Sequence, residues 1–138
     1  MEFTVQTHQF NEIIDITSMV NARIPKTLKC GICHIFCPHT TAGLTINENA
    51  DPDVKHDLLA KLMLLIPRDE PFYRHGECNS DAHLKAMLTG FSLAVPVVNG
   101  ELHLGTWQGI YFCEYDGPRT RMVELFFQRA ENLSLIHI

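Results

Sequence analysis

Residues 100–119 constrain the fold most, because they combine the apolar pattern of a core strand with polar groups that such a strand rarely carries. Side chains of a strand alternate between its two faces. Gln108, Ile110 and Glu114 therefore share one face of this predicted strand. An amide and a carboxylate are costly there if they are buried without partners. They lie either in water at a sheet edge or in a polar cavity.

Glu114 is predicted to be at least partly buried and paired with a cation. Burial alone raises the pKa of a carboxyl group, whereas a nearby arginine or metal lowers it. The basic side chains closest in sequence are Arg119 and Arg121, beyond the corner formed by residues 116–118. We therefore expect Glu114→Gln to weaken ligand binding more than it weakens folding.

Composition limits the class of protein. The 138 residues suffice for one domain with a hydrophobic core, and no apolar run approaches the length of a membrane span. The net charge of −5, without a basic run, argues against nucleic acid as a partner. Five cysteines and no secretory signal at the N-terminus predict a reduced, cytoplasmic protein.

The order of predicted elements indicates an α+β fold. Asp51 and Pro52 suit the start of a helix that ends before Pro67, and a second helix is expected over 81–89. Asn99-Gly100 is a strong hairpin signal. Strands are predicted at 2–9, 13–16, 28–37, 43–47, 91–98, 101–104, 107–115 and 119–128, with a short helix at 17–24. This pattern predicts a single domain in which a mainly antiparallel sheet or sandwich packs with two main helices.

We place the domain at residues 1–130 and assign the C-terminal segment 131–138 outside it. Residues 133–138 back-translate to CTG-TCT-CTT-ATA-CAC-ATC, which matches the mosaic end used in transposase-based sequencing libraries. We therefore interpret the tail as non-native or disordered. The alternative is a natural apolar tail that docks on a neighbour.

Deleting residues 133–138 is expected to leave the melting temperature unchanged within error, because this segment is interpreted as foreign to the fold. Thermal unfolding of the full and shortened chains tests this. A loss of several degrees would show that the tail packs.

Two polar clusters precede the first main helix. His39, Thr40 and Thr41 follow a predicted strand, and they either contact an anionic ligand or form local hydroxyl-to-backbone bonds. Asn47 and Glu48 form the second cluster. Glu48 has no evident structural role, and it lies just before a helix N-terminus, where a carboxylate is stabilised.

A third cluster joins His75 with Asp81 and His83. His83 belongs to the first turn of a predicted helix, where the positive end of the helix favours a neutral imidazole. A neutral imidazole suits a metal ligand or a general base. The alternative is a solvated histidine, and no standard zinc spacing is met.

The chain resembles the YjbQ-like family, and the match is collinear over residues 4–127. The motifs that carry the resemblance are Asn47-Glu48 with Asp51, Asp81-Ala82-His83, residues 104–108 and residues 116–119. His39 also falls on a family motif position. The resemblance implies an α+β fold, a homotrimer and the chemistry of secondary thiamine-phosphate synthases. Those enzymes couple a pyrimidine pyrophosphate to a thiazole phosphate, so Mg²⁺ or another divalent metal is implied as the cofactor.

Two functional hypotheses follow, an enzyme that acts on a phosphorylated small molecule and a non-catalytic trimer that binds a metal or metabolite. No nucleotide cofactor is expected, because the chain lacks a P-loop and a dinucleotide-binding glycine pattern. The site residues are predicted to converge on one pocket. They are His39, Glu48, His83, Gln108 and Glu114 for catalysis; Thr40, Thr41, Asn47, Trp107, Arg119 and Arg121 for substrate binding; and His75, His83 and Asp81 for a metal.

Overall fold

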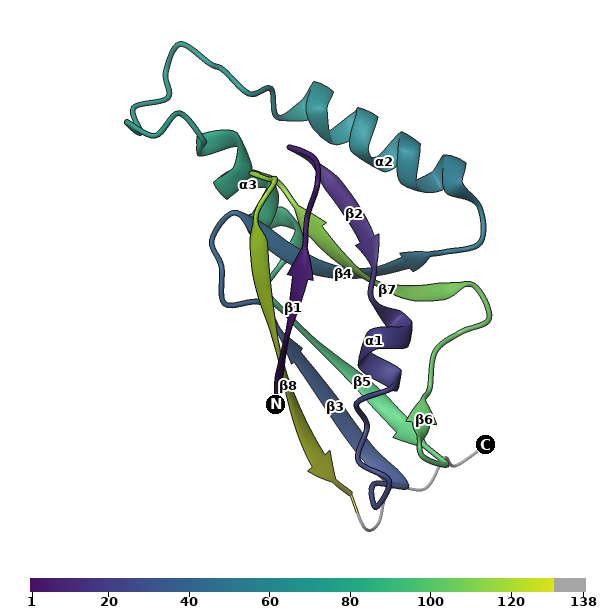
Figure 1. Ribbon diagram of the computed structural model, residues 1–138. Coiled ribbons are helices and arrows are strands. Elements are labelled where there is room, and N and C mark those ends of the chain that lie inside the picture. The colour runs from purple at the N-terminus through teal and green to yellow at the C-terminus, as the bar shows by residue number, and fades with distance from the viewer. Residues whose placement is uncertain (131–138) are drawn as a thin grey trace.

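The computed structural model describes residues 1–130, which form two antiparallel sheets and three helices (Figure 1). The five-stranded sheet, here sheet A, has the order β1-β8-β3-β5-β6, and the three-stranded sheet B has the order β2-β7-β4. The strands are β1 (Glu2–Gln6), β2 (Glu12–Asp15), β3 (Cys30–Phe36), β4 (Ala42–Glu48), β5 (Ser92–Val98), β6 (Glu101–Leu102), β7 (Gln108–Glu114) and β8 (Thr120–Arg129). The helices are α1 (Thr17–Asn21), α2 (Pro52–Leu65) and α3 (Ser80–Thr89). The predicted α+β class is confirmed.

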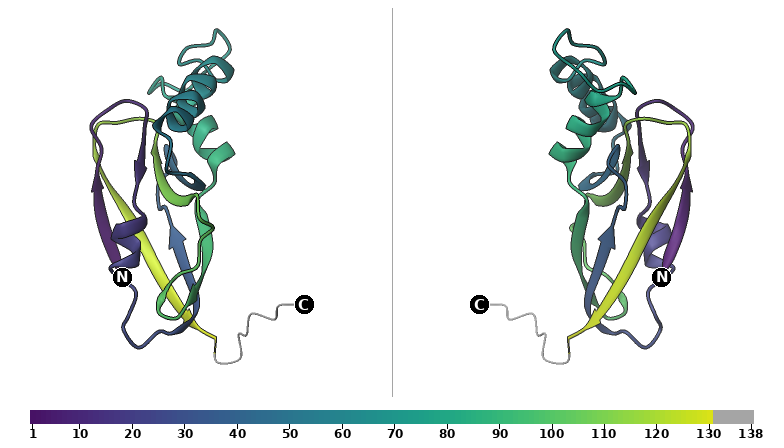
Figure 2. Two further views of the ribbon diagram at one scale, coloured as in Figure 1. Left: turned by 90° about the vertical axis from the view of Figure 1, so that its right-hand side faces the viewer. Right: turned by 90° about the vertical axis from the view of Figure 1, so that its left-hand side faces the viewer.

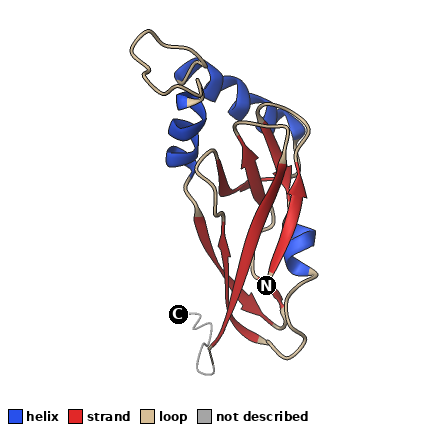
Figure 3. Cartoon of the chain, turned by 60° about the vertical axis from the view of Figure 1, so that its left-hand side comes forward, coloured by secondary structure: helices blue, strands red, loops and turns tan. Residues whose placement is uncertain are grey.

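The two sheets face each other across the main hydrophobic core. Residues of sheet A such as Val123 and Leu125 pack there with Leu44 and Phe112 of sheet B. Val20 of α1 belongs to the same core, whereas α2 and α3 gather at one end of the molecule (Figures 2 and 3). The arrangement is therefore a sandwich with a helical layer over part of it.

Strand β7 is buried on both faces, which explains its apolar composition. Ile110 and Phe112 point into the core between the sheets. Tyr111 and Cys113 belong to a second cluster, where α2 and α3 pack against the other face of sheet B. The predicted alternation along this strand is confirmed, and it places Glu114 on the side that faces sheet A.

The start of α2 and the turn of the β5–β6 hairpin form where the sequence predicts them. The side chain of Asp51 accepts a hydrogen bond from the N–H of Asp53 at 2.9 Å, so Asp51 is the N-cap of α2. Asn99 and Gly100 both have positive φ, 52° and 79°, as a tight hairpin requires. Among residues 1–130, no helix is long and apolar enough to cross a membrane.

Candidate functional site

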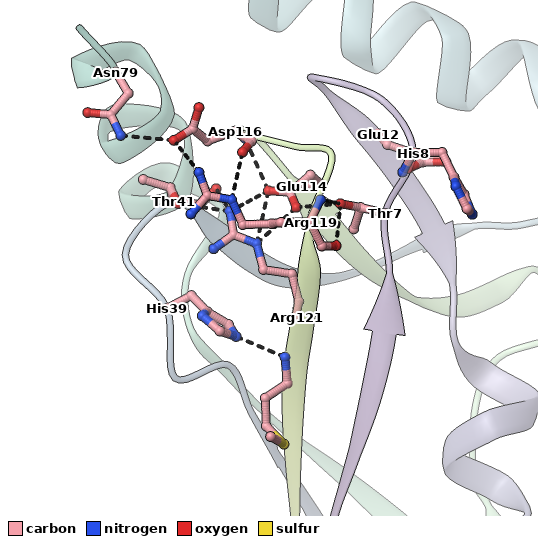
Figure 4. Close-up of polar contacts among 11 residues, drawn as sticks. Thr7, His8, Glu12, His39, Thr41, Asn79, Glu114, Asp116, Arg119 and Arg121 are labelled. Carbon is pink, nitrogen blue, oxygen red and sulfur yellow. Dashed lines mark hydrogen bonds and ion pairs between the residues drawn. The ribbon is translucent and has the colours of Figure 1, made fainter. Parts of the chain in front are cut away.

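The carboxylate of Glu114, at the end of β7, is bound by Arg121 of β8 in sheet A and by two groups just beyond the ends of strands (Figure 4). The Nε of Arg121 donates to its two oxygens at 2.9 and 3.1 Å, and Nη2 of Arg121 also contacts it. Thr7 Oγ1 donates to it at 2.7 Å, and the N–H of Asp116 donates at 3.1 Å. Glu114 is 0% exposed and Arg121 is 3% exposed. The predicted burial of Glu114 and its pairing with a cation are confirmed.

These contacts determine the charge state of Glu114. Burial on its own raises the pKa of the carboxyl group, but hydrogen bonds from Arg121, Thr7 and the Asp116 N–H outweigh burial and hold the pKa below its usual range. Glu114 is therefore ionised at neutral pH. The result is a buried ion pair between β7 of sheet B and β8 of sheet A.

Arg121 and Thr41 complete the same network. Nη2 of Arg121 donates to Thr41 Oγ1 at 2.8 Å and to the Thr41 carbonyl at 3.2 Å, and Thr41 is buried. The Nε and Nη2 donors of Arg121 are thus engaged within the chain. These contacts give both residues a structural role, and their predicted role in substrate binding stays a prediction.

Arg119 lies at the corner between β7 and β8 and remains open to solvent. It donates from Nε to the Asp116 carbonyl at 2.9 Å and from Nη2 to the Asp116 carboxylate at 3.0 Å. Asn79, the residue before α3, donates to the same carboxylate at 2.9 Å. The Arg119 side chain is 49% exposed. Asp116 thereby ties the start of α3 to a corner that presents a guanidinium to solvent.

His39 follows β3 and lies beside this network. Its Nε2 accepts a hydrogen bond from the N–H of Met122 at 2.9 Å. A ring nitrogen that accepts carries no proton, so we assign the proton of the neutral ring to Nδ1. Burial lowers the pKa of His39 below its ordinary value, and the charges of Arg121 and Arg119 lower it further. His39 is thus a neutral imidazole whose Nδ1–H is a donor, and its Nε2 is not free to act as a base.

A pocket of about 420 Å³ opens beside His39. Two phenylalanines line it, Phe36 at the end of β3 and Phe91 just before β5. The loop after β3 contributes Cys37, Pro38, His39 and Thr40. Thr40 is exposed and adds a hydroxyl group. The chain therefore offers donors and apolar walls together at this point.

Lowering the pH is expected to destabilise the wild type through His39, because a protonated ring would turn an N–H toward the Met122 N–H. The folded pKa lies below 6.5, so this stabilisation is complete above 6.5 and is lost as the pH falls through the folded value. When the pH is lowered from 8 to 5, the melting temperature of His39→Gln should fall about 3 °C less than that of the wild type. This difference corresponds to the stability that one hydrogen bond contributes.

Circular dichroism melts at several pH values measure this difference. The matched control is His56→Gln, at an exposed position of α2, which should keep the wild-type profile. Parallel profiles for His39→Gln and the wild type would show that the His39–Met122 contact does not favour the neutral ring.

Glu48 and Gln108 lie at the other end of the β4–β7 pair. They are register partners, whereas Glu114 is opposite Ala42. Gln108 and Glu114 are six positions apart, which corresponds to about 20 Å in an extended strand. Gln108 also has a local role, since its Oε1 accepts from the Gly105 N–H at 2.7 Å. Asn47 and the exposed Trp107 belong to this same end.

The three residues predicted to bind a metal differ in how deeply they are buried. The rings of His75 and His83 are 5.4 Å apart between centroids and line a pocket with Phe72 and Tyr73. Asp81 is instead fully buried, and its Oδ2 lies 3.4 Å from Nζ of Lys85. Within residues 1–130, no three His, Cys, Asp or Glu side chains are grouped so that they could hold a metal. The two imidazoles stay a predicted pair of ligands.

The prediction that the site residues meet in one pocket is wrong for the single chain. His39, Thr41, Glu114, Arg119 and Arg121 come together at one end of the sandwich. Glu48 and Gln108 lie together at the far end of β7, and His83 lines a different pocket from His39. The reason is geometric: residues on one face of a long strand remain far apart along it.

Two members of the network were missed by the sequence analysis. Thr7 lies 107 positions before Glu114, and Asn79 lies 37 positions before Asp116. Both are ordinary residues at the ends of elements, so no local pattern distinguishes them. Only the pairing of β1 with β8 and the position of α3 bring them to the corner.

Comparisons with known proteins agree with this fold. The model of the family described as UPF0047 protein YjbQ-like matches residues 1–130. The UPF0047 protein YugU of Bacillus subtilis (strain 168) is 53% identical over 118 residues, which cover 85% of this chain and 89% of YugU. A UPF0047 protein of Methanocaldococcus jannaschii is 49% identical over 121 residues, 87% of each chain.

Solved structures show the same architecture. A crystal structure of a YjbQ/UPF0047 family protein from Clostridium acetobutylicum superposes with a TM-score of 0.89 at 47% identity, and the match covers 93% of this chain and 99% of that one. A conserved hypothetical protein from Thermus thermophilus gives a TM-score of 0.87 at 42% identity, with coverage of 93% and 99%. The chain belongs to the YjbQ-like family, UPF0047.

Proposed function

We propose that this protein is an enzyme of the cytoplasm that acts on a phosphorylated small molecule, with chemistry like that of secondary thiamine-phosphate synthases. In that reaction a thiazole phosphate attacks a pyrimidine pyrophosphate, a carbon–nitrogen bond forms, and pyrophosphate leaves. The observation that carries the proposal is the group of donors beside the 420 Å³ pocket: neutral His39, exposed Thr40 and the half-exposed guanidinium of Arg119 nearby.

This arrangement suits an anion for electrostatic reasons. Burial lowers the pKa of His39 most, and the positive charges of Arg121 and Arg119 lower it further. Both arginines have a carboxylate partner, but Arg121 is buried with Glu114, whereas the Arg119 side chain is 49% exposed beside Asp116. Donors fixed in place before the reaction stabilise charge that develops on a leaving group. We therefore assign Arg119 to the phosphate oxygens and His39 Nδ1–H to a neutral or anionic acceptor.

Among residues 1–130, no group of three His, Cys, Asp or Glu side chains could hold the implied divalent metal. Mg²⁺ is usually bound by one or two carboxylates together with substrate phosphates. Glu114 is occupied by Arg121, and Asp116 by Arg119 and Asn79. These residues do not fit a cage for the ion, so we assign no step to it.

The second candidate is a non-catalytic homotrimer that binds a metal or metabolite. Two observations favour it: His39 Nε2 is already engaged as an acceptor, and Phe36 and Phe126 are exposed on sheet A, which α2 and α3 do not cover. An exposed aromatic surface is typical of an interaction site. Sedimentation would give the mass of three 15.7 kDa chains if the trimer forms.

Replacing Arg119 by Ala is expected to weaken binding of inorganic pyrophosphate about 10–100-fold, because charge-assisted hydrogen bonds to phosphate are lost. Calorimetry measures binding, and release of pyrophosphate from the substrate pair measures turnover. Arg129→Ala is the matched control, since Arg129 is an exposed arginine at the far end of β8.

The outcomes separate the two candidates. Product formation that Arg119→Ala reduces and Arg129→Ala spares supports the enzyme. Pyrophosphate binding without product supports the binding protein. Equal binding by all three proteins would remove Arg119 from the site.

A further inference from the structure

A cavity of about 220 Å³ lies between the helices and the outer face of sheet B. Leu58 and Leu62 of α2 form one wall, and Leu88 and Thr89 of α3 form another. Cys113 and Tyr115 lie beneath them on the face of β7 opposite Glu114. The cavity is thus separate from the pocket beside His39.

Helix α2 covers this cavity without filling it. Its 14 residues include no buried side chain, and Leu58, Leu59 and Leu62 are only partly buried. The space is open to solvent on one side, since Leu88 in its lining is 65% exposed. The engineered cavity that binds benzene in another protein measures about 150 Å³. The space is therefore large enough for a small ring compound.

Besides Cys113, four polar side chains line the cavity: Thr45, Asn47, Thr89 and Tyr115. The contacts of Thr89 and Tyr115 define which of the two donates. Thr89 Oγ1 donates its one proton to the Lys85 carbonyl at 2.9 Å. Tyr115 Oη lies 2.5 Å from Thr89 Oγ1, so the phenol must be the donor in that bond. The oxygen of Tyr115 then retains two lone pairs that can accept, and the Cys113 thiol, which hydrogen-bonds to this phenol, occupies at most one of them.

The electrostatic character of the lining excludes a charged guest. Among the described residues that line the cavity, none is charged. Burial raises the pKa of the Cys113 thiol to about 12 and raises the pKa of Tyr115 as well, so both are neutral at pH 7. An ion placed there without a partner would pay a large desolvation cost.

We propose that the cavity under α2 binds a small uncharged apolar molecule that carries one hydroxyl group. The apolar body fills the space against Leu58, Leu62 and Leu88, and its hydroxyl donates to the oxygen of Tyr115. This site shares no lining residue with the His39 pocket, and it includes Asn47, which the sequence predicted to bind substrate.

Benzyl alcohol is the probe, and saturation-transfer NMR of the full chain measures its binding. Benzoate has the same ring with a charge in place of the hydroxyl group, so it should bind at least about tenfold more weakly. Tyr115→Phe removes the acceptor and should weaken benzyl alcohol about fivefold. No saturable binding in the millimolar range, or equal binding of benzoate, would overturn the proposal.

Two neighbouring residues of α3 give a matched pair of variants. Leu88 lines the cavity and is 65% exposed, whereas Met87 is 64% exposed and does not belong to the lining. Leu88→Trp should weaken benzyl alcohol at least about fivefold by narrowing the cavity, and Met87→Trp should not. Leu62→Trp fills the cavity from α2 and should abolish binding, with Leu64→Trp as its exposed control. Binding that survives in both filling variants would place the probe elsewhere.

Discussion

Glu114→Gln is expected to reduce the free energy of unfolding by about 3–5 kcal/mol, because removing one partner leaves the other charge buried and unpaired. Arg121 is 3% exposed, and its counter-ion is Glu114. Urea denaturation followed by circular dichroism measures the loss. Glu124→Gln is the control, since Glu124 is a partly exposed carboxylate of the same strand β8 as Arg121.

The stability of the protein at low pH should also depend on the Glu114–Arg121 ion pair. The folded pKa of Glu114 is below its usual value near 4.5, so its contribution to stability is complete above that value. It is lost as the pH falls through the folded pKa, and Glu114→Gln should have a flatter acid limb. A second variant, Glu114→Leu with Arg121→Met, replaces both charges and should recover much of the lost stability.

The result also decides what Glu114 does. The sequence alone suggested that Glu114→Gln would weaken ligand binding more than folding, and no observation yet tests that hypothesis. The inter-sheet contacts now favour the reverse order. A stability loss below about 1 kcal/mol together with lost ligand binding would restore Glu114 to the functional site.

Local signals in the sequence were sufficient for most of the elements. Asp51, Pro52 and Asp53 specify the start of α2 through short-range hydrogen bonding and backbone geometry. Asn99 and Gly100 specify a turn because they tolerate positive φ. The alternation along β7 correctly assigned its two faces, since that property depends only on strand geometry.

The site was less predictable because it depends on distances between elements. Gln108 and Glu114 were expected in one pocket, but the strand that connects them holds them at opposite ends of β7. His39 was expected to serve as a catalytic group, and its proton position depends on Met122, which lies 83 residues away. Neither fact follows from residue type or spacing.

Function therefore depends on which polar groups remain available after folding. Glu114, Arg121 and Thr41 are bound to one another inside the sandwich. Arg119 and His39 keep donors at the surface of the same end. Burial therefore distinguishes the side chains that are engaged within the fold from those that keep donors at the surface.

Lys85→Met is expected to reduce the free energy of unfolding by a similar amount, about 3–5 kcal/mol, because it leaves Asp81 as a buried charge. Lys85 Nζ lies 3.4 Å from Asp81 Oδ2, and the two side chains are 2% and 0% exposed. Asp81 Oδ1 has no hydrogen-bond partner among the described residues. The contact of Oδ2 with Lys85 is therefore what stabilises the buried carboxylate.

The control is Lys61→Met, at an exposed position of α2, which should stay within about 0.5 kcal/mol of the wild type. Adding Asp81→Leu to Lys85→Met removes the orphaned carboxylate and should recover part of the loss. The same experiment tests Asp81 as a metal ligand. If Asp81 binds a metal, a chelator should destabilise the wild type and Zn²⁺ should rescue Lys85→Met; if Asp81 serves only the ion pair, neither addition should change the unfolding curve.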